Sequence, residues 1–129
     1  MITQVAVALV AQNGCYLVGR RGPDGPLAGY FEFPGGKCEP GESPANCAVR
    51  ECLEETGLKV DVIRLRCDFQ HTFPYGTVHL HFFDCRPLPE TDSEKLDPRF
   101  GWVPRDDLGA YRFPEANESV VAELINSYS

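Results

Sequence analysis

Residues 36–58 read GKCEPGESPANCAVRECLEETGL, and this segment has the clearest structural signals of the chain. Its second half has the signals of a helix, because Ser43 can cap the N-terminus, Pro44 suits the first turn and Gly57 suits the residue after the last turn. Apolar side chains recur between these ends at helical spacing, so one face of the helix can pack against a core. The residues of this apolar stripe are Ala45, Ala48, Val49, Cys52 and Thr56.

A second face of the same helix is acidic. Glu51, Glu54 and Glu55 stand at positions i, i+3 and i+4, where like charges repel each other by about 0.2–0.5 kcal/mol per pair. One interpretation is an ordinary amphipathic helix whose glutamates are solvated. The glycines before the helix and the additional acid Glu42 favour another interpretation, in which a divalent cation offsets the repulsion.

The order of these residues resembles the Nudix box, the signature of the Nudix hydrolases. The box consists of Gly, five residues, Glu, seven residues, Arg-Glu, an aliphatic residue, any residue, Glu-Glu, any residue, Gly and an aliphatic residue. Cys52 is the one departure, and it replaces the first aliphatic residue by another small apolar one. The residues that fill the box in register are Gly36, Glu42, Arg50, Glu51, Glu54, Glu55, Gly57 and Leu58.

The resemblance implies a metal site made of glutamates. Glu54 and Glu55 are then the chief metal ligands, Glu51 lies beside them, and the backbone carbonyl of Gly35 completes the shell. Mg²⁺ is the expected cofactor because it prefers hard oxygen ligands and binds together with phosphates, and Mn²⁺ is the alternative.

Catalysis is expected from the same helix. We interpret Glu51 as the general base that accepts a proton from the attacking water, while a loop acid, Glu94 or Glu90, could contribute instead. Arg50 also belongs to the catalytic set, as an ion-pair partner that orients Glu54 at position i+4.

Three further fragments resemble the MutT-type 8-oxo-dGTP diphosphatases of this family. They are LVGRR at residues 17–21, FEFPGGK at residues 31–37 and FPEAN at residues 113–117. In that family the second arginine of the first fragment and the asparagine of the last fragment contact the nucleotide. The resemblance therefore implies that Arg21 and Asn117 bind substrate.

The chemistry of these side chains suits a nucleotide. Phe33 aligns with an aromatic residue near the base and offers an apolar wall. Asn117 carries a donor and an acceptor on one amide, so it can read a purine edge. Two simpler interpretations stay open, in which Asn117 bonds only to backbone in the first turn of a helix and Arg21 is a solvated loop charge.

The combined resemblance implies an enzyme, a metal-dependent nucleoside triphosphate pyrophosphohydrolase. Its expected reaction converts oxidised 8-oxo-dGTP to the monophosphate and pyrophosphate, which contributes to DNA repair. A CTP-type or broad nucleoside triphosphate pyrophosphatase of the same family is the alternative enzyme. A non-catalytic, nucleotide-binding Nudix domain is a third hypothesis, which the intact acids of the box disfavour.

Length and charge agree with these expectations. The 129 residues predict a single domain, 1–129, and leave the oligomeric state open. The net charge of −7 argues against a nucleic-acid polymer as partner, because such a partner requires a basic surface. The sequence contains neither a signal peptide nor an apolar span of membrane length, so we expect a cytoplasmic protein with no membrane partner, whose six cysteines are reduced.

The rest of the chain predicts mainly strands, with a hairpin at Asn13-Gly14 and a final helix that has Pro114 in its first turn. Strands and two amphipathic helices together predict an α/β fold, a three-layer α/β/α sandwich with a mixed β-sheet, which the Nudix resemblance also implies. His79 and His81 share one face of a strand, and we interpret them as a solvated or packed pair. The predicted strands cover residues 3–11, 15–19, 30–33, 59–73, 77–85 and 100–103, and the predicted loops cover residues 20–29 and 86–98.

Overall fold

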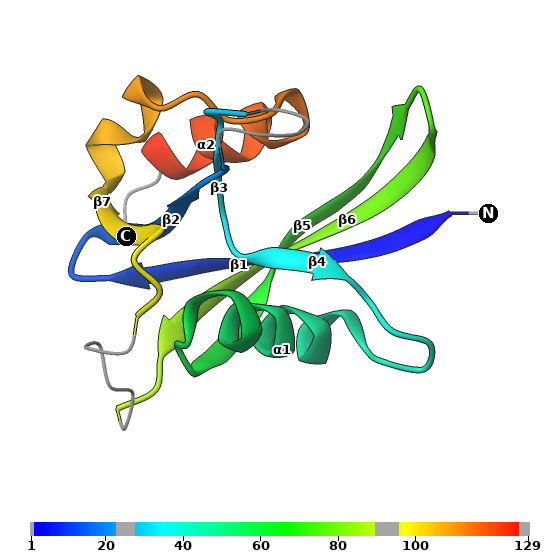
Figure 1. The fold of residues 1–129 in the computed structure, drawn as a ribbon, viewed down its shortest axis with the longest axis horizontal. Helices are drawn as coiled ribbons and strands as arrows, with labels where there is room; N and C mark the ends of the chain where they lie inside the picture. Colours follow the sequence, from blue (N-terminus) through cyan, green and yellow to red (C-terminus); the bar gives the residue numbers. More distant parts are fainter. Residues whose placement is uncertain (1, 23–27, 90–95, 127–129) are drawn as a thin grey trace.

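The computed structural model describes residues 2–22, 28–89 and 96–126 (Figure 1). Its fold is of the α/β class, as the sequence predicts. The strands are β1 (Thr3–Gln12), β2 (Cys15–Arg20), β3 (Phe31–Glu32), β4 (Gly35–Lys37), β5 (Val60–Phe73), β6 (Gly76–Pro87) and β7 (Phe100–Pro104). The helices are α1 (Pro44–Thr56) and α2 (Glu118–Ile125), with short 3₁₀ turns η2 (Arg105–Ala110) and η3 (Glu115–Asn117).

Strand β1 organises a mixed sheet because it changes partners along its length. Its N-terminal half pairs with β4 on one side, from Val5 opposite Lys37 to Val7 opposite Gly35. Its C-terminal end pairs with β2 through the predicted hairpin. On its other side it runs parallel to β6, which in turn forms a long antiparallel hairpin with β5. The sheet order is β3-β2-β1-β6-β5, with β7 paired to β2.

The two helices cover opposite faces of this sheet, which confirms the three-layer arrangement (Figure 1). Strand residues alternate between two hydrophobic clusters because successive side chains point to opposite faces. The cluster under α1 includes Ala6, Ala8, Val10, Cys47, Ala48 and Cys52. The cluster under α2 includes Val7, Leu9, Phe33, Phe82, Val120 and Leu124.

Both predicted ends of α1 are confirmed. The Ser43 hydroxyl accepts a hydrogen bond of 3.2 Å from the Asn46 N–H, and Pro44 is the first residue of the helix. Gly57 has φ of 81°, a left-handed conformation that favours glycine, and its N–H donates to the carbonyl of Leu53.

The buried stripe of α1 differs from the predicted one. Cys47, Ala48, Cys52 and Thr56 are buried, whereas Ala45 and Val49 are only partly covered. The reason is tertiary: the Cys47 side chain faces the incoming β4 segment, where its thiol contacts the Gly36 carbonyl at 3.5 Å.

The prediction of one strand over residues 30–33 is only partly confirmed, because β3 consists of Phe31–Glu32 alone. The chain turns at Pro34, and a second short strand, β4, starts at Gly35 and pairs with β1 instead of β2. Proline has no N–H to donate to a ladder, which explains the break. The hairpin at Asn13-Gly14 is confirmed, since both residues have positive φ, 51° and 77°, as a type I′ turn requires.

The final helix starts later than predicted, so the placement of Pro114 in its first turn is wrong. Pro114 has an extended backbone, with ψ of 150°, and precedes the separate 3₁₀ turn η3. The Asn117 N–H closes this turn by donating to the Pro114 carbonyl at 2.8 Å, and α2 begins only at Glu118. The 3₁₀ turn η2 is a further element that the sequence analysis did not predict.

Two predicted loops are described only in part. Strand β2 continues to Arg20 and strand β6 to Pro87, while residues 23–27 and 90–95 lie outside the described residues. Within the described ranges, no helix has the length and apolar character needed to cross a membrane.

Candidate active site

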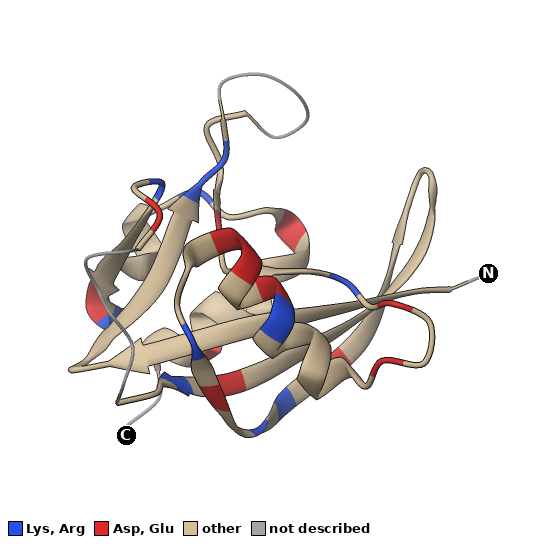
Figure 2. Cartoon of the chain, turned by 60° about the horizontal axis from the view of Figure 1, so that its bottom comes forward, with Lys and Arg blue, Asp and Glu red and all other residues tan. Residues whose placement is uncertain are grey.

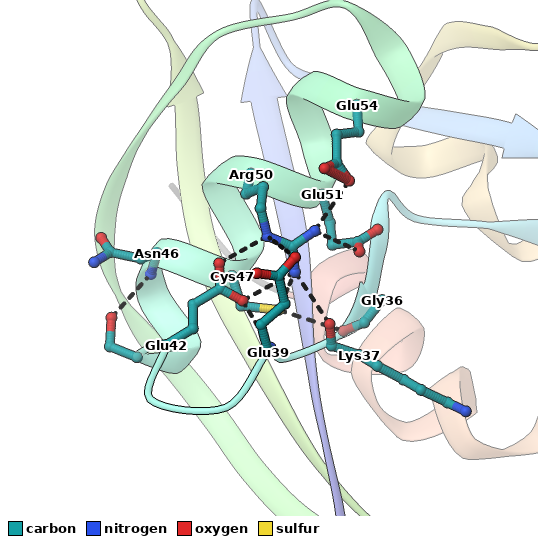
Figure 3. Close-up of polar contacts among 10 residues, drawn as sticks. Gly36, Lys37, Glu39, Glu42, Asn46, Cys47, Arg50, Glu51 and Glu54 are labelled. Carbon is teal, nitrogen blue, oxygen red and sulfur yellow. Dashed lines mark hydrogen bonds and ion pairs between the residues drawn. The ribbon is translucent and has the colours of Figure 1, made fainter.

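Arg50 is the centre of an ion-pair network on the exposed side of α1 (Figure 3). Its guanidinium donates two hydrogen bonds to Glu42, of 2.7 Å from Nε and 2.9 Å from Nη2. Its Nη1 donates to Glu51 and to Glu54, each at 3.0 Å, so the predicted ion pair with Glu54 is confirmed. A further bond from Nη2 to the Lys37 carbonyl, at 3.1 Å, joins α1 to β4. Arg50 therefore holds in place two of the three glutamates that are predicted as metal ligands.

Glu42 has a role that the sequence analysis did not assign. The hydrogen bond from Arg50 lowers the pKa of the Glu42 carboxyl to about 2, with help from the Glu39 N–H. Glu42 thus stays ionised and fixes the guanidinium from the side opposite Glu51 and Glu54. The position of Glu42 in the box marked it as an acid, but only the tertiary contact shows that it serves Arg50.

Glu55 is the half-buried member of the acidic face. Its carboxylate accepts a hydrogen bond of 2.8 Å from the Gly35 N–H, which connects the end of α1 to the start of β4. The pKa of Glu55 is raised to about 7, chiefly because burial disfavours its charge. The nearby carboxylates of Glu32 and Glu51 contribute to the rise, and the hydrogen bond from the Gly35 N–H opposes it. This position favours a positive charge beside it, as a metal ion would provide.

Two glycines bring β4 close to its neighbours. A side chain at Gly35 would meet the backbone of β1, with its Cβ only 2.5 Å from the Ala6 carbonyl oxygen. A side chain at Gly36 would meet the Glu51 carboxyl group, also at 2.5 Å. The glycines therefore leave room for the protein's own backbone and for Glu51 at this site.

The four predicted metal-binding positions lie on adjoining elements. Glu51, Glu54 and Glu55 project from α1, and Gly35 lies at the start of β4, bonded to Glu55. The Glu51 side chain is 18% exposed and that of Glu54 is 56% exposed, so the set faces partly into solvent. Acidic residues gather along α1 in Figure 2. The two alternative general bases, Glu90 and Glu94, lie outside the described residues.

A cleft of about 730 Å³ adjoins these carboxylates. Gly35 and Gly36 line it, so the cleft and the glutamate cluster share the β4 segment. The cleft also receives the three predicted substrate-binding residues, Arg21, Phe33 and Asn117, which come from distant parts of the chain. The structure therefore places all the predicted site residues, except the acids outside the described residues, in one region.

The structure gives the local contacts of Arg21, Asn117 and Phe33. Arg21 donates a hydrogen bond of 3.0 Å to Glu32, which also lines the cleft. Asn117 is half-buried, and its side chain makes no capping hydrogen bond to α2. Phe33 is 5% exposed and stacks on Phe113 with ring centroids 4.9 Å apart, so it forms a rigid apolar wall.

The tip of the β5–β6 hairpin forms a wall of the cleft that sequence reasoning missed. Residues 71–75 all line the cleft. Phe73 and Tyr75 stack on each other with ring centroids 5.1 Å apart, yet Tyr75 is 79% exposed. Exposed apolar patches mark binding grooves, so the aromatic residues of this turn were a signal that could have indicated a binding role.

Comparisons with known proteins agree with the fold. The NUDIX domain family matches residues 5–123 of the chain. The 8-oxo-dGTP diphosphatase of Escherichia coli is 34% identical over 122 residues, which cover 94% of this chain and 95% of that protein. The CTP pyrophosphohydrolase of Escherichia coli is 35% identical over 78 residues, which cover 60% of this chain and 58% of that protein. A solved structure of MutT, from work on Aliivibrio salmonicida and Vibrio cholerae, has a TM-score of 0.71 and 28% identity, with 98% of both chains covered.

Proposed function

The chain belongs to the Nudix hydrolase family, and from this membership we propose that it converts nucleoside triphosphates to the monophosphate and pyrophosphate, with 8-oxo-dGTP as the preferred substrate. The observation that carries the proposal is the half-buried carboxylate of Glu55 beside Glu51, at the edge of a cleft that also contains Arg21, Phe33 and Asn117. The carboxylates proposed to bind metal and the residues proposed to bind the base thus belong to one site. The similarity to the Escherichia coli 8-oxo-dGTP diphosphatase supports the choice of base.

The donor set fits a hard divalent cation. Glu51, Glu54, Glu55 and the carbonyl of Gly35 offer only oxygen ligands, which suits Mg²⁺, with Mn²⁺ as the alternative. When bound, such an ion neutralises phosphate charge and lowers the pKa of a bound water. The raised pKa of Glu55 supports this assignment, because burial and, to a smaller extent, the carboxylates of Glu32 and Glu51 disfavour a charge that a cation would stabilise.

The residues of the chain then perform the remaining steps. Glu51 accepts the proton of the attacking water. This role is supported by the place of its carboxylate, which lies next to Gly36 and accepts a hydrogen bond from Arg50. Arg50 keeps Glu51 and Glu54 oriented, and Glu42 keeps Arg50 in place. Removal of Arg50 would therefore act through the glutamates that it positions.

Base recognition belongs to the other end of the cleft. Phe33 provides the apolar surface against which a purine can pack, and it is itself held by Phe113. The half-buried Asn117 offers an amide with no side-chain capping bond, so its donor and acceptor are available to a base edge. Arg21, 3.0 Å from Glu32, supplies a positive group toward the nucleotide.

A CTP-directed or broad nucleoside triphosphate pyrophosphatase is the second candidate. The observation in its favour is the 35% identity to the Escherichia coli CTP pyrophosphohydrolase, although that match covers 60% of the chain. A non-catalytic nucleotide-binding domain is disfavoured, since Glu51, Glu54 and Glu55 are all present and Arg50 orients two of them.

A panel of nucleotides tests the proposal. The purified protein is incubated with Mg²⁺ and 8-oxo-dGTP, dGTP, CTP or ADP-ribose, and kcat/KM is measured for each. Phosphorus NMR identifies the products, and we expect pyrophosphate as the first phosphorus product. Release of orthophosphate would overturn the proposed cleavage, and a preference for CTP would establish the second candidate.

The proposed setting is the reducing cytoplasm, where removal of oxidised dGTP from the nucleotide pool serves DNA repair. All six cysteines are unpaired, which agrees with that compartment. The net charge of −7 supports a small nucleotide as substrate instead of a nucleic-acid polymer.

A further inference from the structure

Two histidines and an aspartate lie together on the sheet face opposite the cleft. Along β6, Val78, Leu80 and Phe82 belong to the hydrophobic cluster under α2, so the alternating His79 and His81 point to the other face. Asp68 of β5 is paired in register with His81. Gln4 of β1 is paired in register with His79. Three adjacent strands therefore contribute side chains to one small area.

The polar atoms of these side chains converge. His79 Nε2 lies 2.7 Å from the Asp68 carboxylate, and His81 Nε2 lies 2.8 Å from the side-chain oxygen of Gln4. The two imidazole rings are 4.1 Å apart between centroids. One ligand atom from each of Asp68, His79 and His81 lies within 4.8 Å of the other two.

We propose that Asp68, His79 and His81 bind a divalent transition-metal ion of the zinc class, with the side-chain oxygen of Gln4 next to the fourth position. Zinc takes nitrogen and oxygen ligands at about 2.0–2.2 Å in a tetrahedron, which places ligand atoms about 3.3 Å from one another. The present separations reach that value through small rotations of the side chains, because Asp68 is exposed and both histidines are only partly buried.

The donor types separate this site from the glutamate cluster. Two imidazoles and one carboxylate suit zinc, nickel or copper, whereas the all-oxygen set on α1 suits magnesium. The ordinary alternative is a pair of cross-strand hydrogen bonds, His79 with Asp68 and His81 with Gln4, on a solvated sheet face. The two alternatives differ in whether a metal ion stabilises the protein through these histidines.

A bound ion would stabilise the part of the sheet that lines the cleft, from the opposite face of the sheet. It would connect β5 and β6 directly, and Gln4 would add β1. The other face of these strands presents Val5, Val7 and Leu80 to the cleft, and the β5–β6 hairpin ends in residues 71–75 at its rim. Figure 1 shows β1, β5 and β6 running side by side. The inference does not depend on the proposed hydrolysis, so its test measures binding.

The test titrates ZnCl₂ into the protein by calorimetry, in a background of Glu54→Gln and Glu55→Gln that removes the carboxylate competition from α1. A phosphine reductant keeps the cysteines reduced. We expect one equivalent of zinc to bind, to raise the melting temperature and to resist excess Mg²⁺. His81→Asn should weaken binding by roughly tenfold or more, since even loss of a group that only supports a ligand costs about that much.

His71→Asn is the matched control, because His71 lies on the same hairpin outside the cluster, and it should retain full zinc affinity. Asp68→Asn is a second variant, which keeps the shape of the side chain and one acceptor oxygen but removes the charge, and it should also weaken binding. Co²⁺ in place of Zn²⁺ should give the visible absorption bands of a tetrahedral site, and His81→Asn should remove them.

Unchanged zinc affinity in both His81→Asn and Asp68→Asn would overturn the proposal. An equal loss of zinc affinity in His71→Asn would also overturn it. Cys38 donates its N–H to the Gln4 carbonyl, so its thiolate could offer a zinc ligand nearby. Loss of zinc affinity in Cys38→Ser would therefore overturn the proposal as well.

Discussion

Replacement of Glu55 by glutamine should stabilise the metal-free protein at neutral and alkaline pH. Glutamine keeps an oxygen that can accept the Gly35 N–H bond, but it removes a charge that burial disfavours. The folded-state pKa of Glu55 is about 7, above its ordinary value of 4.5. An acid with a raised folded-state pKa is not destabilising below its unfolded-state pKa, and it becomes destabilising as the pH rises toward the folded-state value.

The size of the effect follows from that difference. A rise from 4.5 to about 7 corresponds to an upper limit of about 3.4 kcal/mol, at about 1.4 kcal/mol for each tenfold change in proton affinity. Glu55 is only half-buried, so solvent screening reduces this figure, and we expect about 1–2 kcal/mol. For a domain of this length that corresponds to a gain of about 3–8 °C in melting temperature above pH 7. The gain should disappear near pH 4.5.

Thermal unfolding of wild type and Glu55→Gln in chelator, from pH 4.5 to pH 8, measures the effect. Addition of Mg²⁺ at ten times its dissociation constant should stabilise wild type by about 1.4 kcal/mol and the variant by much less. Glu54→Gln is the matched control on the same face of α1. The Glu54 side chain is 56% exposed, so its loss in chelator should change stability by no more than about 0.5 kcal/mol.

Two results would contradict this prediction. If Glu55→Gln is no more stable than wild type in chelator at pH 8, burial of the Glu55 charge does not destabilise the fold. If the gain is the same at pH 4.5 and at pH 8, the variant acts through packing and not through the charge.

Three further predictions concern activity. Glu54→Gln should lower Mg²⁺-dependent turnover at least about 100-fold while the circular dichroism spectrum stays native, and full turnover by wild type in excess chelator would contradict the metal assignment. Asn117→Ala should reduce the ratio of kcat/KM for 8-oxo-dGTP over dGTP by roughly 5- to 100-fold, because a paired polar group is worth about 1–3 kcal/mol; an equal fall for both substrates would assign Asn117 a structural role. Gly36→Ala should displace the Glu51 carboxylate and lower kcat, whereas Gly101→Ala, which has open space at its Cβ, should leave kcat unchanged; equal activity of the two variants would show that Glu51 tolerates displacement.

The sequence alone was sufficient for the ends of α1 and for the set of side chains that share its acidic face. Its N-cap, its C-terminal glycine and its acidic face are local features, because capping and i, i+4 contacts act within a turn or two of the chain. The Asn13-Gly14 hairpin is local in the same sense. The pairing of Arg50 with Glu54 followed from helical spacing alone and is confirmed at 3.0 Å.

The substrate residues were indicated by resemblance and not by local chemistry. Arg21, Phe33 and Asn117 stand in separate fragments, and nothing in their own neighbourhoods required them to share a cleft. The late start of α2, after a 3₁₀ turn, also escaped prediction, because Pro114 suits either a helix start or an extended residue. The structure resolved that choice in favour of the extended conformation.

Tertiary structure alone decided the properties that depend on burial and on contacts between distant elements. Glu55 has a raised pKa because the fold partly buries it and Glu32 lies near it, and neither fact is visible in the spacing of the box. The hydrogen bond between Arg50 and Glu42 and the space that Gly36 leaves for Glu51 also depend on tertiary structure. Both require β4 to lie next to β1 and α1. A sequence pattern specifies which side chains share a face of one helix or strand. The burial of a carboxylate and the charges near it, which set its pKa, depend on the other elements that pack around it.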